Sequence, residues 1–185
     1  MHKVYCIIGR SATGKSTITR KAADILNMKI IKSYTTRNLR ENETIESADH
    51  IFIHKNEVKY YKDDIIAYTK RRGYCSFTTK QQLFESDFCI INPLSFYELL
   101  ERAREMNIKL ITIYIYVPYI KNEERAKQRG DYLSWKENFN KEYNEFKRFE
   151  KSKFIDYKIL NNCSIEDGVK KMIDIIKEDQ LKERN

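Results

Sequence analysis

The stretch "GRSATGKS" at residues 9–16 decides the fold, because an apolar run precedes it and a helical pattern follows it. The run is "VYCII" (4–8), and the pattern is "TITRKAADIL" (17–26). Two of the chain's five glycines stand in this stretch, and a lysine and a serine directly follow the second. A Gly-x-x-x-x-Gly-Lys-Ser loop between a strand and a helix turns backbone N–H groups and the positive helix end toward phosphate oxygens.

The spacing predicts that this loop binds the phosphates of a nucleoside triphosphate, ATP. Lys15 is expected to reach the β- and γ-phosphates, and the Ser16 hydroxyl to bind Mg²⁺. A strand–helix turn with an exposed lysine is the alternative. It does not account for the glycine spacing, the Lys-Ser pair and the strand–helix context together. The expected ATP-binding positions of the loop are Gly9, Arg10, Ser11, Ala12, Thr13, Gly14, Lys15, Ser16 and Thr17.

Apolar runs alternate with helical patterns along the rest of the chain. Strand-like runs, rich in β-branched and aromatic residues, stand at 3–8, 88–91, 110–117 and 157–160. Helical patterns stand at 15–27, 94–106, 119–129 and 164–180. Such runs are typical of strands buried on both faces of a parallel sheet. Their alternation with helices predicts a three-layer α/β domain.

Two segments interrupt this alternation. Residues 33–80 contain the short runs "HIFI", "IIAYT" and "YCSFTT", bounded by charged turns, which predict a small inserted antiparallel sheet. Residues 130–151 form a strongly polar helical segment. We therefore expect one domain over 1–185, with a core made of 1–32, 81–129 and 152–185.

Composition narrows the range of partners. The net charge of +8 favours anionic partners, and the basic residues are spread along the chain rather than gathered in one tail. This distribution favours solvated faces and one anion site over a dedicated nucleic-acid surface. No apolar stretch reaches the roughly 18 residues that span a bilayer, and no signal peptide is evident, so we expect a cytoplasmic protein without a membrane partner. The cysteines, which are scattered, predict neither disulfides nor a metal site.

The stretch "SYTTRNLRENE" (33–43) offers a second anion site. Arg37 and Arg40 follow the aliphatic hydroxyl side chains of Ser33, Thr35 and Thr36, and Glu43 comes three residues after Arg40. Guanidinium groups bind phosphate in a bidentate manner, and hydroxyls can add hydrogen bonds. Taken alone, the stretch is equally compatible with a charged surface loop.

Together with the loop, five further motifs resemble guanylate kinases in order and spacing, over essentially the whole chain. They are "TTRNLRENE" (35–43), "DHIF" (49–52), "GYCSFTTK" (73–80), "ERAKQRG" (124–130) and "DYKILNN" (156–162). The resemblance implies a P-loop kinase fold in which the insertion 33–80 binds a nucleoside monophosphate (NMP). It also implies that the helical segment 130–151 is a lid that closes over ATP.

The resemblance also assigns roles to individual residues. Ser33, Arg37 and Arg40 look like ligands of the acceptor phosphate, and Glu43 looks like the residue that orients the two arginines. Two arginines of the 119–129 segment are similar to those that reach the transferring phosphoryl group, and an asparagine is similar to the one near the adenine of ATP. These residues are Arg125, Arg129 and Asn161. The expected catalytic residues are Lys15, Arg37, Arg40, Arg125 and Arg129.

The base-reading positions depart from the family pattern. The positions of a glutamate and an aspartate that read guanine hold Ala67 and Asn92, and only a hydroxyl residue, Thr78, is kept. His50 and Ser76 stand where the family has tyrosines, and a third lid arginine is replaced by Asn138. Asn92 could offer guanine its carbonyl or another base its NH₂ group. The expected substrate-binding residues are Ser33, Arg37, Arg40, Glu43, His50, Ser76, Thr78 and Asn92.

These features predict an Mg²⁺-dependent transferase that moves the γ-phosphoryl of ATP to GMP or dGMP, as a monomer or homodimer. The expected preference for guanine over other purine bases is narrower than two carboxylates would give. Two alternatives remain: a ribose 1,5-bisphosphate kinase and a non-catalytic guanylate-kinase-like module that binds proteins. The Arg37, Arg40 and Glu43 set favours a nucleotide acceptor, and the intact phosphate loop favours catalysis.

Overall fold

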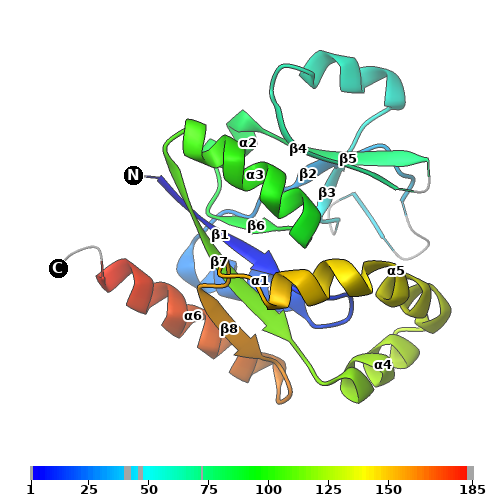
Figure 1. Cartoon of the computed structure of the whole chain (residues 1–185), viewed down its shortest axis with the longest axis vertical. Helices are drawn as coiled ribbons and strands as arrows, with labels where there is room; N and C mark the ends of the chain where they lie inside the picture. Colours follow the sequence, from blue (N-terminus) through cyan, green and yellow to red (C-terminus); the bar gives the residue numbers. More distant parts are fainter. Residues whose placement is uncertain (1, 40–42, 46–47, 72, 183–185) are drawn as a thin grey trace.

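The computed structural model describes residues 2–39, 43–45, 48–71 and 73–182. Its central sheet has four parallel strands in the order β6-β1-β7-β8. They are β1 (His2–Ile8), β6 (Phe88–Ile90), β7 (Ile108–Tyr116) and β8 (Tyr157–Leu160). Helices α1 (Lys15–Leu26) and α6 (Ile165–Leu181) cover one face, and α3 (Pro93–Glu105) and α5 (Tyr132–Glu150) cover the other (Figure 1). The predicted three-layer α/β fold is confirmed.

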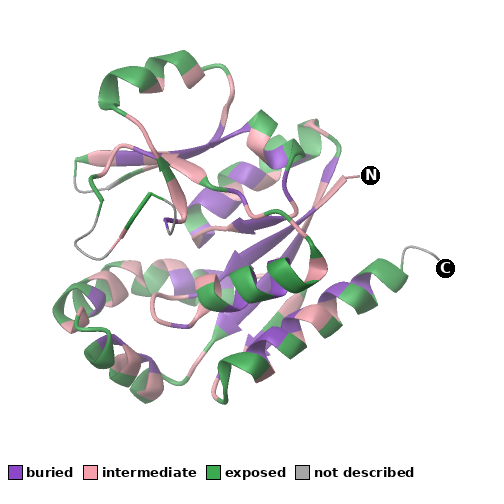
Figure 2. Cartoon of the chain, turned by 180° about the vertical axis from the view of Figure 1, so that it is seen from behind, coloured by how far each residue is buried: buried purple, intermediate pink, exposed green. Residues whose placement is uncertain are grey.

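Side chains of β1 alternate between the two faces of the sheet. Val4, Cys6 and Ile8 pack with residues of α3 and α5, whereas Tyr5 and Ile7 pack with residues of α1 and α6. Because helices cover both faces, the whole run has to be apolar, which is the pattern that the sequence shows. Figure 2 shows the strands of this sheet as buried and the outer faces of the helices as exposed.

A second sheet stands beside the core, in the order β3-β2-β5-β4. It consists of β2 (Ser33–Thr35), β3 (His50–Phe52), β4 (Ile65–Arg71) and β5 (Tyr74–Thr79). The expectation of an antiparallel sheet is wrong in one respect, because β2 and β3 run parallel while the β2–β5 and β4–β5 pairs are antiparallel. The long connection 36–49 lets the chain return in the same direction, whereas the tight turn at Gly73 reverses it.

Two short helices belong to this part of the chain and were not predicted. The 3₁₀ helix η1 (Lys55–Tyr61) and α2 (Lys80–Phe84) each begin with a capping box. In α2 the Thr79 hydroxyl accepts from the Gln82 N–H, and the Gln82 side chain accepts from the Thr79 N–H. The Thr-x-x-Gln spacing is a local sequence pattern that predicts the start of this helix.

Helices α4 (Tyr119–Gln128) and α5 follow β7 and pack against each other (Figure 1). The ring of Trp135, which is 1% exposed, contacts Tyr119, Tyr132 and Phe139. The last turns of α5 place Phe146 and Phe149 in the apolar cluster on the α3 side of the sheet. Helix α5 is therefore joined both to α4 and to the core. None of the helices in the described part of the chain has the length and apolar character that crossing a bilayer requires.

Candidate functional site

The loop between β1 and α1 has the backbone shape that its sequence predicts. Ala12 and Gly14 have positive φ angles of 63° and 88°, so the chain curls before α1 begins at Lys15. Gly9 lies so close to β7 that a Cβ atom there would stand 2.2 Å from the Ile115 carbonyl oxygen. The first glycine therefore allows the loop to leave the sheet beside β7, and the second allows the curl.

The loop is held in shape by a side chain of its own and by side chains from distant elements. The Asn161 amide donates to the Thr13 carbonyl at 2.8 Å, and the Thr13 hydroxyl donates to the Arg10 carbonyl at 2.9 Å. Arg125 on α4 donates to the Asn161 carbonyl at 3.0 Å. Asn161 is only 3% exposed, so its side chain supports the loop. Its predicted position near the adenine of ATP stays a prediction.

Lys15 is bound to its own loop. Its half-buried ammonium donates to the Arg10 carbonyl at 2.8 Å. Burial lowers the pKa of Lys15 to about 8, with a smaller opposing effect from Glu142 and a further lowering by Arg129. At pH 7 the ammonium is therefore largely charged. It is placed to exchange a carbonyl oxygen for the stronger partner that a phosphate oxygen provides.

A cavity of about 570 Å³ lies over the loop and brings together most of the residues singled out from the sequence. One wall is the loop and the start of α1, and the other is the segment from β2 to β3. The loop wall contributes Ser11, Ala12, Gly14, Lys15, Ser16 and Thr17. The opposite wall contributes Ser33, Arg37, Glu43, Asp49 and His50, and the cavity is also lined by Arg20 of α1 and by Arg129 at the end of α4. Arg20 and Asp49, which sequence reasoning passed over, form an ion pair at 2.6 Å.

Arg37 is held rigidly on the second wall. Its two terminal nitrogens donate to the two carboxylate oxygens of Glu43 at 2.6 and 2.7 Å, and its guanidinium lies 5.0 Å from the centre of the Phe52 ring. The Arg37 and Glu43 side chains are only 10% and 15% exposed. This is the arrangement by which a carboxylate orients an arginine. Arg40, the other predicted arginine, lies outside the described residues.

His50 lies beside Arg37 because β2 and β3 pair in parallel with Ser33 opposite His50. The His50 Nδ1 atom and the Ser33 hydroxyl are 3.0 Å apart. Burial, and then the positive charge of Arg37, lower the pKa of His50 below its usual value, against weaker opposing effects of Ser33, Asp49 and Glu43. The imidazole is therefore neutral at pH 7 in the absence of an anion.

The cavity continues into a smaller one of about 210 Å³, which shares Ser33, Arg37 and His50 with it. Beyond these three residues, its described lining is uncharged and includes Ala67, Thr69, Tyr74, Ser76, Thr78, Asn92 and Ser95. The predicted lack of base-reading carboxylates thus extends to the whole described lining, which carries no acidic side chain. Among the charged side chains that the structure describes, only that of Arg37 lines this space.

Several polar groups of the smaller cavity are already engaged. The Asn92 carbonyl accepts from the Ser95 N–H at 2.9 Å and thereby caps α3. The Ser76 hydroxyl donates to the Thr35 hydroxyl at 2.9 Å. The Asn92 oxygen that is expected to face guanine thus also caps α3, which uses one of its two lone pairs, and its role toward a base stays a prediction. The NH₂ group of Asn92 points the other way and offers a donor.

The two arginines of the α4 segment lie in different places. Arg129 lines the large cavity and donates to the Ser11 hydroxyl at 3.3 Å and to Asp131 at 2.6 Å. Arg125 instead packs under the loop. A further cleft of about 800 Å³ between the second sheet and α5 is lined by Arg37, Arg129 and Asn138, and also by Lys55. No local pattern in the sequence indicated that Lys55 would face this cleft.

The donor set for a metal ion is small. Within the described ranges, no group of three or more His, Cys, Asp or Glu side chains could hold a metal ion. The Ser16 hydroxyl lines the large cavity beside Lys15. Mg²⁺ keeps several waters and takes phosphate oxygens as ligands, so one hydroxyl beside a phosphate site fits this ion.

Comparisons with known proteins identify the fold. No protein-family model matches the sequence, and no curated protein matches it. The structure is similar to that of the guanylate kinase from Anaplasma phagocytophilum, with a TM-score of 0.65 and 19% identity, over 97% of this chain and 86% of that one. It is also similar to the protein APE1195, with a TM-score of 0.50 and 12% identity, over 96% of both chains. The chain therefore has a guanylate kinase-like, nucleotide kinase fold.

Proposed function

We propose that this chain is an ATP-dependent NMP kinase of guanylate kinase type, which converts GMP or dGMP to the diphosphate and releases ADP. The observation that supports the proposal is one cavity with two anion-binding walls. The phosphate loop and Lys15 form the first wall, and Ser33, Arg37 and His50 form the second. Transfer between two phosphate groups requires that both sit in one place lined with positive charge.

In this proposal the chain contributes positioning and charge. The loop N–H groups and Lys15 hold the β- and γ-phosphates, while Arg37, fixed by Glu43, holds the acceptor phosphate. An acceptor oxygen bonds to the γ-phosphorus as the bond to the β–γ bridging oxygen breaks, and ADP leaves. The acceptor phosphate is already anionic at pH 7, so no side chain has to remove a proton. Mg²⁺, held at Ser16, would neutralise charge on the β- and γ-phosphates.

The smaller cavity supports a relaxed choice of base. The Asn92 NH₂ group and the Thr78 hydroxyl can donate to the 6-keto oxygen of a purine. The described lining has no carboxylate to accept from N1–H and the 2-amino group of guanine. A hydrogen bond to a charged group contributes about 1.5–3 kcal/mol, so its absence lowers discrimination by about ten- to a hundredfold. We therefore expect GMP to exceed IMP and AMP by a narrow margin.

A coupled ADP-release assay tests the proposal. Purified protein receives ATP and Mg²⁺ with GMP, dGMP, IMP, AMP or ribose 1,5-bisphosphate, and a reaction without acceptor gives the background. The expected result is turnover with purine monophosphates, highest with GMP or dGMP. Normal ATP binding without turnover on any purine monophosphate would overturn it.

One observation favours a second candidate, a kinase of ribose 1,5-bisphosphate. The described lining of the smaller cavity has no carboxylate. A sugar phosphate has no base, so a site that binds it needs no carboxylate to recognise one. The buried Arg37–Glu43 pair is the feature that weighs toward the nucleotide. Turnover restricted to ribose 1,5-bisphosphate in the same assay would decide for this candidate.

A further inference from the structure

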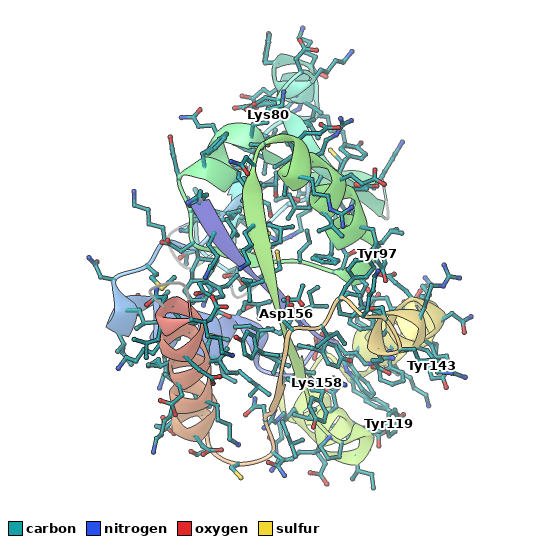
Figure 3. The ribbon with its side chains drawn as sticks, turned by 60° about the vertical axis from the view of Figure 1, so that its left-hand side comes forward. Lys80, Tyr97, Tyr119, Tyr143, Asp156 and Lys158 are labelled. Carbon is teal, nitrogen blue, oxygen red and sulfur yellow. The ribbon has the colours of Figure 1, made fainter. Side chains whose placement is uncertain are left out.

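The side chain of Arg10 leaves the phosphate loop on the side away from the large cavity. Its guanidinium carbon lies 4.6 Å from the centre of the Phe139 ring, 4.7 Å from that of Phe146 and 5.8 Å from that of Tyr143. All three rings belong to α5, where Figure 3 labels Tyr143. The Arg10 side chain is only 13% exposed. Besides the backbone groups, Lys15 and Ser16 that are expected to meet its ligand, the loop has thus placed a further cation inside an aromatic cluster.

The last turn of α5 compensates the buried charge. Glu150 lies 3.5 Å from the Arg10 Nη2 atom and accepts from the Tyr114 hydroxyl at 2.5 Å. Burial, and the hydrogen bond to Glu150, raise the pKa of Tyr114, so this hydroxyl remains a donor. Arg10 is therefore held by rings and a carboxylate of α5, and this carboxylate is itself fixed to β7.

The backbone of the same residue faces the nucleotide side. The Arg10 carbonyl accepts from the Lys15 ammonium at 2.8 Å. The next residue contacts α5 as well, because the Ser11 carbonyl accepts from the Trp135 indole N–H at 3.3 Å. A phosphate that draws Lys15 away from the Arg10 carbonyl would therefore act on a segment whose side chain is fixed in α5.

We propose that Arg10 is a positioning residue that fixes the phosphate loop to α5, so that a nucleoside triphosphate bound by the loop changes the order of α5. The identity of the ligand rests on the proposed function, whereas the connection rests on the Arg10 contacts. Coupling between two sites is reciprocal. The factor by which a bound triphosphate shifts the order of α5 is also the factor by which that order changes the affinity for triphosphate. Loosening the Arg10 contacts should therefore weaken triphosphate binding by up to this factor.

The chain carries its own reporter and its own control. Trp135 is the only tryptophan, so its fluorescence reports on the junction between the loop and α5. Lys147 lies 5.5 Å from the centre of the Tyr143 ring on the exposed side of the same helix. Lys147→Ala therefore removes a second cation beside the same ring without touching the loop. Arg10→Lys keeps the charge but lacks the flat guanidinium that stacks on rings.

The experiment measures ATP affinity by calorimetry, Trp135 emission during ATP titration, and hydrogen exchange of α5 amides with and without ATP. We expect Arg10→Ala to weaken ATP binding about five- to tenfold, to remove most of the ATP-induced emission change and to speed exchange in α5. Arg10→Lys should lie between this variant and the wild type, and Lys147→Ala should match the wild type.

Two results overturn the proposal. One is a folded Arg10→Ala protein, or Arg10→Lys if the alanine variant does not fold, with wild-type ATP affinity and a full emission change. The other is a wild type whose α5 exchange and Trp135 emission do not respond to bound ATP. No step uses an acceptor, so wild-type protein that binds ATP but phosphorylates nothing contradicts the proposed function alone. A wild type that binds no ATP contradicts both.

Discussion

The loop at residues 9–16 and the smaller cavity open onto the same space but are built by different means. The loop offers backbone groups and one lysine, and buried contacts from Thr13 and Asn161 hold it in shape. The smaller cavity offers side-chain hydroxyls and an amide, and Ser76 and Asn92 already use part of their hydrogen bonding inside the protein. Backbone N–H groups remain when a side chain is substituted, so a site made of them keeps its ligand contacts. A site made of side chains changes its selectivity when those residues are substituted.

The largest expected effect breaks the loop side. Lys15→Ala should reduce phosphoryl transfer by about a hundred- to a thousandfold, because it removes a charge that the transition state needs. The thermal midpoint should change little, since the ammonium bonds to only a loop carbonyl among the contacts described. Lys21→Ala, on the exposed side of α1 beside Glu166, is the control and should retain full activity. Normal turnover by a folded Lys15→Ala protein would contradict the role of the loop.

A substitution on the acceptor wall should act on one substrate only. Arg37→Ala should raise the KM for the monophosphate about ten- to a hundredfold, the cost of losing a charge-assisted bond, and leave ATP affinity nearly unchanged. Steady-state kinetics with each substrate varied gives both values. Arg20→Ala removes a cation from the same cavity, where Arg20 pairs with Asp49, and should have a much smaller effect. Equal losses of affinity for the monophosphate and for ATP would contradict the assignment of Arg37 to the acceptor phosphate.

Introducing a carboxylate into the smaller cavity should change the choice of base and leave the loop unaffected. Ala67→Glu should increase the preference for GMP over IMP about tenfold, since a carboxylate can accept from the 2-amino group. The ratio of kcat/KM for the two acceptors measures it. Ala67→Gln has the same size without the charge, and Ala67 is only 5% exposed, so this variant controls for crowding. A ratio that is unchanged with glutamate, or shifted equally by glutamine, would contradict the assignment of this position.

Raising the pH above 8 should lower the affinity of the loop for ATP. The folded protein holds the pKa of Lys15 at about 8, and a bound triphosphate raises it, so above pH 8 the free protein must take up a proton to bind. ATP affinity should therefore fall about fivefold between pH 8 and pH 9. For the same reason, stability without ligand should rise as the pH increases from 8 toward the usual pKa of lysine. Calorimetry across this range, with Lys15→Arg as a variant that stays charged, is the test.

The smallest effect concerns His50 and the acceptor wall. The pKa of His50 is held below its usual 6.5, so the unfolded chain binds more protons near that pH, and stability falls as the pH drops through 6.5. An acceptor phosphate should raise the pKa of His50, so acceptor KM should improve about two- to threefold from pH 7.5 to pH 6.5. His50→Gln should lose this gain, and His54→Gln, at the exposed start of η1, should keep it. Equal pH profiles for the wild type and His50→Gln would contradict it.

The sequence predicted what depends on neighbouring residues. The loop follows from a spacing of eight residues, and the buried strands follow from continuous apolar runs, so both were found at nearly their observed bounds. The parallel β2–β3 pair, by contrast, depends on how a long connection returns, which no local pattern records.

The positions of two further side chains have the same explanation. Asn161 lies beneath the loop and Arg10 lies against α5 because residues more than a hundred positions apart meet there. The role of Asn92 did have a local signal, since Asn followed by Pro at the start of an apolar helix is typical of a helix cap.

The strand order has a consequence for how the protein is made. β1 emerges from the ribosome before the other strands of its sheet, yet it lies between β6 and β7, and the Thr13 carbonyl gains its partner only when Asn161 has been made. Domains tend to complete their folding only when their partners in sequence have been synthesised. The loop is therefore translated before β6, β7 and β8 but gains its buried support only after them. We expect a nascent chain to acquire its triphosphate site only after β8 has emerged.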